Sequence, residues 1–228
     1  MMTTKIKERP IVLTAQEVNA VLAGDKTQHR VPVLTSEQVA AGYKCCYGVA
    51  SGQVIFTKDE SDKSFVEDGY INVECALGSI GDRLWVREFH ARTDRNDHLT
   101  RPHYYADGTL RPDLRHDAGL LIKYSAEDMP RWASRLLLEI TDICIERVQD
   151  ISEAEIQREF VESEFIETSI SPDGFRIYKI VGTKRLWSEC VIQAFKSYWD
   201  SIYGKGAWDR NDWVWVIEFK VIKENDDD

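Results

Sequence analysis

Residues 14–30 read TAQEVNAVLAGDKTQHR, a helical pattern that passes directly into a run of polar residues. Thr14 is a favoured N-cap, and Glu17 three residues later completes a capping box. Apolar residues recur at helical spacing behind this start. Gly24 stands where a left-handed C-terminal cap is needed. The stretch therefore predicts a short amphipathic helix that ends abruptly at Gly24.

The polar run after this helix is a candidate site. It combines cationic side chains, oxygen donors and acceptors, and an imidazole that titrates near neutrality: Lys26, Thr27, Gln28, His29 and Arg30. A solvated loop is the alternative interpretation.

The rest of the chain alternates irregularly between helices and strands. We expect a second helix that begins after Thr35, with Gln38 in its capping box, and ends at Gly42. We expect a third helix that begins at Ser152, with Glu155 in its capping box. The other expected elements are strands or an irregular insertion at 43–80, a strand at 81–89, a long loop or lid at 90–130, a strand at 136–141, a hairpin at 165–182 around Pro172-Asp173-Gly174, a helix at 184–203 and a strand at 213–221. This order favours an α+β fold around a small mixed β-barrel with peripheral helices over a doubly wound parallel sheet.

Composition narrows the function classes. The net charge of −10 disfavours nucleic-acid binding through a general basic surface but allows a local basic cleft. The chain contains no apolar run long enough for a membrane span and no secretory signal, so we expect no membrane partner and a cytoplasmic protein. Five cysteines, an odd number without a Cys-x-x-Cys pair, favour a reducing compartment, and neither they nor the histidines show the spacing of a metal site. We expect no metal and no cofactor.

Glu139 is the second candidate for chemistry, because it stands between apolar residues in the strand pattern 136–141. A buried carboxyl would have a raised pKa and could donate a proton, whereas a nearby cation such as Lys26 would lower that pKa. Lys26 or His29 could activate water, and Thr27 could be a nucleophile. Glu139 on the wet face of a half-exposed strand is the alternative.

Two tryptophans lie beside arginines and could stack a nucleobase. Trp85 precedes Arg87 in the strand at 81–89, and Trp132 follows Arg131 just before the strand at 136–141. Stacking on aromatic rings is how unpaired bases are recognised. Core packing is the alternative for each ring.

These motifs resemble ASCH domains of the PUA-like superfamily. The resemblance rests on Gly24-x-Lys26-x-x-x-Arg30 after a short helix, on GDRLWVRE at 81–88, on PRWASR at 130–135, and on WDSIYGK at 199–205 followed by DWVWVIEF at 212–219. The last two resemble the larger ASCH-type proteins of phages and prophages. The resemblance implies one ASCH/PUA-like domain at 9–222 with insertions at about 43–78, 90–130 and 160–182. We also expect a flexible N-terminus at 1–8 and, because of its acidic residues, a disordered tail at 223–228.

The resemblance also implies an activity. Small ASCH enzymes deacetylate N4-acetylcytidine with a lysine, a threonine three residues later and a glutamate on a barrel strand. Lys26 matches the lysine and Glu139 the glutamate, but His29 stands at the threonine position and Thr27 is offset by two residues. We expect a protein that recognises a modified nucleoside or single-stranded RNA, and most concretely an N4-acylcytidine hydrolase. Arg30, Arg87, Trp85, Arg131 and Trp132 would bind the substrate. The alternatives are a non-catalytic RNA-binding or protein-interaction module of a phage, or a ribonuclease. A phage-encoded protein would act in the bacterial host cytoplasm.

Overall fold

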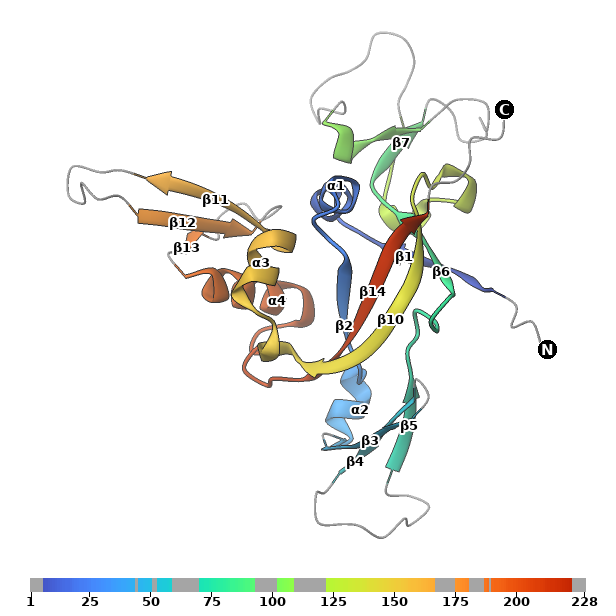
Figure 1. Cartoon of the computed structure of the whole chain (residues 1–228), viewed down its shortest axis with the longest axis vertical. Coiled ribbons are helices and arrows are strands. Elements are labelled where there is room, and N and C mark those ends of the chain that lie inside the picture. The colour runs from blue at the N-terminus through green and yellow to red at the C-terminus, as the bar shows by residue number, and fades with distance from the viewer. Residues whose placement is uncertain are drawn as a thin grey trace.

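Five strands form the central sheet of the molecule (Figure 1). The computed structural model describes residues 6–43, 45–50, 53–58, 70–92, 102–108, 122–166, 175–180, 187–188 and 190–222. The strand order is β1 (Glu8–Val12), β6 (Arg83–Arg87), β10 (Leu137–Arg147), β14 (Trp213–Ile222) and β2 (Gln28–Pro32). β1 runs parallel to β6, and the other neighbours are antiparallel. Within the described residues the sheet is open, with β1 and β2 at its edges.

One face of all five strands packs into a single core. Its strand residues are Ile11, Leu84, Val86, Leu138, Ile140, Trp215, Ile217, Phe219 and the partly buried Val31. The helix α1 (Ala15–Ala23) joins β1 to β2 and adds Val18 and Val21 to this core. Alternating side chains of a strand point to opposite faces, so the other face of the same strands carries different residues.

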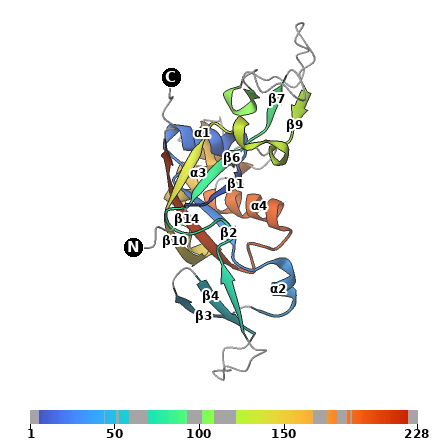
Figure 2. The same ribbon diagram turned by 90° about the vertical axis from the view of Figure 1, so that its right-hand side faces the viewer.

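Two further helices cover part of that second face. α3 (Glu153–Phe160) and α4 (Val191–Tyr203) pack with β14 in a second core, which contains Ile156, Phe195, Trp199, Val214 and Val216. In Figure 2, α4 lies beside the sheet, with α1 above it and α2 (Ser36–Ala40) below. β14 is therefore buried on both faces where α3 and α4 cross it, which explains its nearly continuous apolar sequence.

The helix boundaries follow the sequence signals. Thr14 caps α1 and Thr35 caps α2, each within a complete capping box. Gly24 ends α1 with a φ of 82°, a conformation that glycine adopts without a Cβ clash. Ser152 donates to and accepts from Glu155 at the start of α3. All three predicted capping boxes are confirmed.

Three small sheets surround the central one (Figure 1). The insertion at 43–80 contains β3 (Cys45–Ala50), β4 (Gln53–Thr57) and β5 (Tyr70–Glu74). The predicted hairpin contains β11 (Val161–Ile166) and β12 (Phe175–Ile180), which pairs with β13 (Trp187–Ser188). Its predicted turn at 172–174 lies outside the described residues, as does the acidic tail at 223–228.

The interpretation of 90–130 as a long loop or lid is wrong for its described parts. Its described parts form a sheet of β8 (His103–Tyr104), β7 (His90–Arg92) and β9 (Ile122–Tyr124), with 3-10 turns at Tyr105–Asp107 and Ala126–Asp128. Strands of two or three residues are too short to show a readable alternation in sequence.

Three predicted boundaries also differ from the structure. α4 begins at Val191 rather than 184, because Trp187 pairs with Lys179 in a strand. The flexible N-terminus cannot extend to residue 8, because Glu8 begins β1 and the Lys7 N–H donates to Asp82. β10 continues past 141 to Arg147. The predicted strand ended too early because a register shift after Ile140 changes the phase of the apolar pattern.

The α+β class is confirmed by these elements. None of the helices in the described parts of the chain is long and apolar enough to cross a membrane.

Candidate functional site

Glu17 is the centre of the candidate site, and its two carboxylate oxygens have different partners. Oε2 accepts hydrogen bonds from the Thr14 backbone N–H at 2.9 Å and from the Thr14 hydroxyl at 3.0 Å. Oε1 lies 3.6 Å from the Lys26 ammonium and 3.8 Å from His29 Nδ1. The carboxylate that caps α1 therefore also pairs with the cationic run that follows the same helix.

Burial strengthens the interaction between these charges, because little water screens them. The Lys26 side chain is fully buried and that of Glu17 is 9% exposed. Burial alone raises the pKa of Glu17, but the Lys26 and His29 charges and the Thr14 hydrogen bonds outweigh it, so this pKa lies below its ordinary value. Burial, followed by the repulsion from Lys26, lowers the pKa of His29 to about 4. At neutral pH the site therefore holds a carboxylate and a neutral imidazole.

Arg30 is held by a second capping carboxylate in the same way. Glu155 Oε2 bonds to Ser152 at the start of α3, and Glu155 Oε1 accepts from Arg30 Nη2 at 2.9 Å. Glu146 on β10 lies 3.8 Å from the same nitrogen. The Arg30 side chain is only 2% exposed, so this arginine joins β2 to α3 besides bordering the pocket described next.

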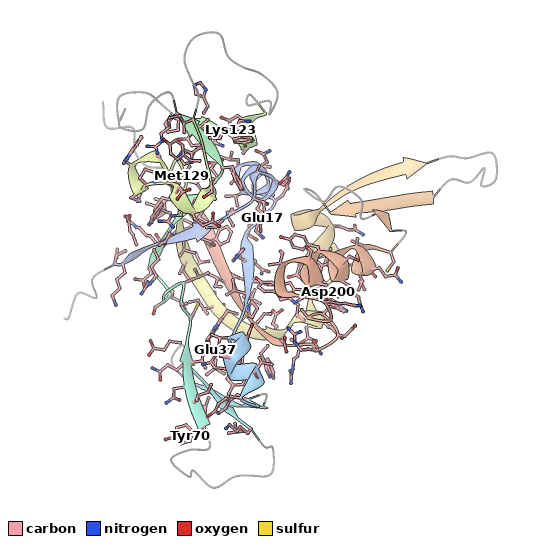
Figure 3. All side chains as sticks on the ribbon, turned by 180° about the vertical axis from the view of Figure 1, so that it is seen from behind. Glu17, Glu37, Tyr70, Lys123, Met129 and Asp200 are labelled. Carbon is pink, nitrogen blue, oxygen red and sulfur yellow. The ribbon has the colours of Figure 1, made fainter. Side chains whose placement is uncertain are left out.

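A pocket of about 310 Å³ opens beside these groups. Its wall combines β1, α1 and β2 with one side of α4: Val12, Thr14, Glu17, His29, Arg30, Tyr198, Trp199, Ile202 and Tyr203. Figure 3 labels Glu17 and Asp200, which mark the α1 and α4 sides of this region. Burial, and then the Glu17 charge, raises the pKa of Tyr203 to about 12, and the pKa of Tyr198 is also raised. Both hydroxyls therefore remain protonated hydrogen-bond donors at neutral pH.

Glu139 lies elsewhere, on the outer face of β10. It is opposite Lys220 on one side and Arg83 on the other, and its Oε1 is 2.9 Å from Lys220 Nζ. Glu8 on β1 is opposite Arg83 as well. A row of charges with alternating sign therefore runs across β1, β6, β10 and β14. The structure thus brings Lys26 together with Glu17 rather than with Glu139, which does not line the pocket.

The other predicted site residues are also distributed. Thr27 is exposed, and its carbonyl accepts from the Phe219 N–H, which extends the β2–β14 ladder. Trp85 is buried on β6, and the Arg87 guanidinium lies 4.6 Å from the centre of its ring. Arg87 is opposite Val12, which lines the pocket, but neither Arg87 nor Trp85 does so.

Arg131 and Trp132 lie in the 3-10 turn Arg131–Ala133, away from the pocket wall. Arg131 Nε donates to Glu8 Oε2 at 2.9 Å. Trp132 is 41% exposed and faces the Arg92 guanidinium at 5.4 Å from its ring centre.

The sequence identified Glu17 only as a capping residue, and it did not indicate that Tyr198, Trp199 and Tyr203 line a pocket. A carboxylate in a capping box uses one oxygen for the helix and leaves the other available, which is the signal that could have identified Glu17. The tyrosines gave no such signal, because their positions around α4 become meaningful only when that helix packs with β14 and lines the pocket together with β2.

The arrangement suits proton transfer and polar recognition next to aromatic surface. Among the described residues no group of three or more histidine, cysteine, aspartate or glutamate side chains is placed to hold a metal ion.

Comparison with known proteins adds no relative: no family model, no curated protein and no solved structure matches this chain.

Proposed function

We propose that the protein recognises a single nucleobase in the Glu17 pocket and, most concretely, hydrolyses the acyl amide of an N4-acylated cytidine. The ASCH-like spacing of Gly24, Lys26 and Arg30 supports this class, and the α+β fold with one sheet face packed into a single core is compatible with it. The observation that carries the proposal is the ionised Glu17, held by buried Lys26 and facing neutral His29 in a pocket with aromatic walls.

The chemistry assigns a role to each of these groups. His29 accepts a proton from a water molecule, whose oxygen bonds to the acyl carbon. The bond between that carbon and the cytosine amine nitrogen then breaks, and His29 returns the proton to the departing nitrogen. The products are a carboxylic acid and cytidine. The protonated Tyr203 hydroxyl can donate to the acyl oxygen as negative charge develops there.

Glu17 and Lys26 act through His29 in this scheme. Glu17 Oε1 lies 3.8 Å from His29 Nδ1, longer than a hydrogen bond, and such contacts commonly shorten when substrate binds. The carboxylate orients the imidazole and stabilises it while it carries the proton. Lys26 is too deeply buried to touch substrate, and it keeps Glu17 ionised.

Turnover of N4-acetylcytidine tests the enzymatic proposal. We expect Glu17→Gln and His29→Gln to lower kcat/KM by about 100-fold or more, the usual contribution of a positioned general base. Glu139→Gln is the matched control, because it removes a carboxylate outside the pocket and should leave turnover unchanged. The reverse pattern would move the site to Glu139, and no turnover by the wild type would end the enzymatic proposal.

Binding without catalysis is the second candidate, favoured by the 3.8 Å separation of Glu17 and His29. In this case N4-acetylcytidine binds but is not hydrolysed. Tyr203→Leu weakens its binding by about 1–3 kcal/mol, the contribution of one stacked base. Phe89→Leu is the control, since Phe89 is exposed outside the pocket. Isothermal titration calorimetry measures both variants, and equal affinities would contradict a base stacked in the pocket.

A further inference from the structure

A second polar cluster lies on the small sheet formed by β8, β7 and β9. His90 and Arg92 share one face of β7, and Tyr124 on β9 is directly opposite His90. Trp132 approaches from the 3-10 turn Arg131–Ala133. Figure 3 labels Lys123 and Met129 in this part of the molecule. The cluster shares no residue with the Glu17 pocket.

Arg92 is the unusual member of this cluster. The residue is only 7% exposed, and no carboxylate of the described residues lies within ion-pair distance. Its guanidinium lies 4.1 Å from the Tyr124 ring centre and 5.4 Å from that of Trp132, and its Nε is buried without a hydrogen-bond partner. Cation–π contacts contribute up to about 2 kcal/mol when desolvated. Burying an ion costs several kcal/mol, so the rings compensate only part of the loss of water.

Arg135, nearby, shows how this fold stabilises a comparable guanidinium. It lies 4.1 Å from the Tyr104 ring centre, the same separation as Arg92 from Tyr124. Arg135 also forms two hydrogen bonds to Glu88, at 2.8 and 3.0 Å, and one to Asp107 at 2.6 Å. Among the described residues, Arg92 has aromatic partners but no carboxylate partner.

Two further polar groups of this cluster have no hydrogen-bond partner in the part of the chain that the structure describes. The Tyr124 hydroxyl is buried without a hydrogen bond, and so is Nε2 of the fully buried His90. His90 Nδ1 lies 3.2 Å from the Glu88 carbonyl oxygen and donates to it, which leaves Nε2 as an acceptor. Both rings contact each other in a stack, with centroids 5.3 Å apart. The Arg92 cation and the His90 imidazole therefore both contact the Tyr124 ring, whose own hydroxyl is also buried.

We propose that Arg92, Tyr124 and His90 form a phosphate-binding site separate from the Glu17 pocket. A phosphate oxygen supplies the anion that Arg92 lacks and accepts from the Tyr124 hydroxyl. His90 Nε2 accepts from a phosphate hydroxyl or from a ribose 2′-hydroxyl. The same chemistry fits free phosphate and an RNA backbone. In the RNA case the exposed Trp132 indole stacks the adjoining base.

Phosphate binding is measured by the rise in melting temperature with sodium phosphate, against sodium chloride of equal ionic strength, because a ligand of the native state stabilises it. A single-stranded oligoribonucleotide of about eight residues serves as the second probe, long enough for a stacked base beside a phosphate. We expect Arg92→Met to weaken phosphate binding by about tenfold or more, since a charge-assisted hydrogen bond contributes about 1.5–3 kcal/mol. Arg210→Met, which removes an exposed arginine elsewhere, is the control and should leave binding unchanged.

Tyr124→Phe keeps the stacked ring and removes only the hydroxyl, so it remains informative if Arg92→Met does not fold. We expect it to weaken phosphate binding severalfold, by the loss of one hydrogen bond of about 1 kcal/mol. Binding of phosphate alone identifies a free anion as the ligand, and much tighter binding of the oligoribonucleotide, lost in Trp132→Ala, identifies RNA. The site would be overturned if the wild type bound neither probe. It would also be overturned if Arg92→Met and Tyr124→Phe both bound phosphate as tightly as the wild type. None of these outcomes depends on turnover at Glu17.

Discussion

At the scale of single residues, the candidate site depends on one carboxylate with two functions. Glu17 caps α1 through Oε2 and faces Lys26 and His29 through Oε1. A fully buried ammonium without a partner would be costly, so Lys26 and Glu17 stabilise each other's charged forms. Burial and the positive charge of Lys26 both disfavour a proton on His29. The protonation states needed for base catalysis are therefore built into the burial of this pair.

The depressed pKa of His29 predicts a loss of stability in mild acid. Between pH 6.5 and about 4 the unfolded chain binds a proton at His29 that the folded chain does not, so stability falls as the pH is lowered through this window. The group accounts for about 2 kcal/mol between pH 7 and pH 5. Urea unfolding at both pH values should show this loss in the wild type and a smaller loss in His29→Gln. Equal losses would show that His29 has an ordinary pKa.

The outer face of the sheet gives a prediction for Glu139. Its pair with Lys220 is solvent-exposed, and such pairs are worth about 0.2–1 kcal/mol. A double-mutant cycle with Glu139→Gln and Lys220→Met should therefore give a coupling energy in the free energy of unfolding within that range. A coupling of several kcal/mol would instead indicate a buried or strained carboxylate, as a catalytic role would require.

At the scale of elements, the capping boxes of α1 and α3 do more than begin helices. In each, the glutamate uses one oxygen for the cap and the other for a cation of the run 26–30. α2 has the same box with a neutral residue, Gln38, and its cap is exposed. The start of α1 is thereby coupled to the site, whereas the start of α2 is not.

This difference predicts unequal effects of two matched substitutions. Thr35→Ala should cost about 1 kcal/mol, the usual value of an N-cap. Thr14→Ala should cost about 2 kcal/mol, because it also removes the hydroxyl that donates to the buried Glu17 carboxylate. Chemical denaturation of both variants measures the difference, and Thr14→Ser should restore most of the loss. Equal costs would contradict the coupling between cap and site.

At the scale of the whole molecule, the charge of −10 separates two kinds of ligand. Binding of an uncharged nucleoside releases no counterions, so its dissociation constant should change by less than about twofold between 50 and 500 mM salt. An oligoribonucleotide held through phosphates should weaken steadily over the same range. Calorimetric titrations at several salt concentrations measure both slopes. A steep slope for the nucleoside would contradict recognition of an uncharged ligand in the aromatic-lined pocket.

Much of the architecture could be predicted from local sequence signals. The capping boxes of Thr14, Thr35 and Ser152 placed three helix starts, alternation identified the strand around Leu84, and a nearly continuous apolar run identified the strand around Val216. The full length of β10 could not be predicted, because the bulge after Ile140 breaks the two-residue period. The strands around His90 were too short to show any period.

The sequence alone determined the α+β class, the capped helix before Lys26 and the proximity of Lys26 to His29, because these depend on residues close together in the chain. Only the tertiary structure decided which carboxylate joins them. Glu139 and Glu17 have equally suitable chemistry, but side-chain direction and strand order place Glu139 beside Lys220 and turn Glu17 toward Lys26. The aromatic wall of the pocket was decided in the same way, because α4, which is distant in sequence, packs with α3 and β14 and so lines the pocket together with β2.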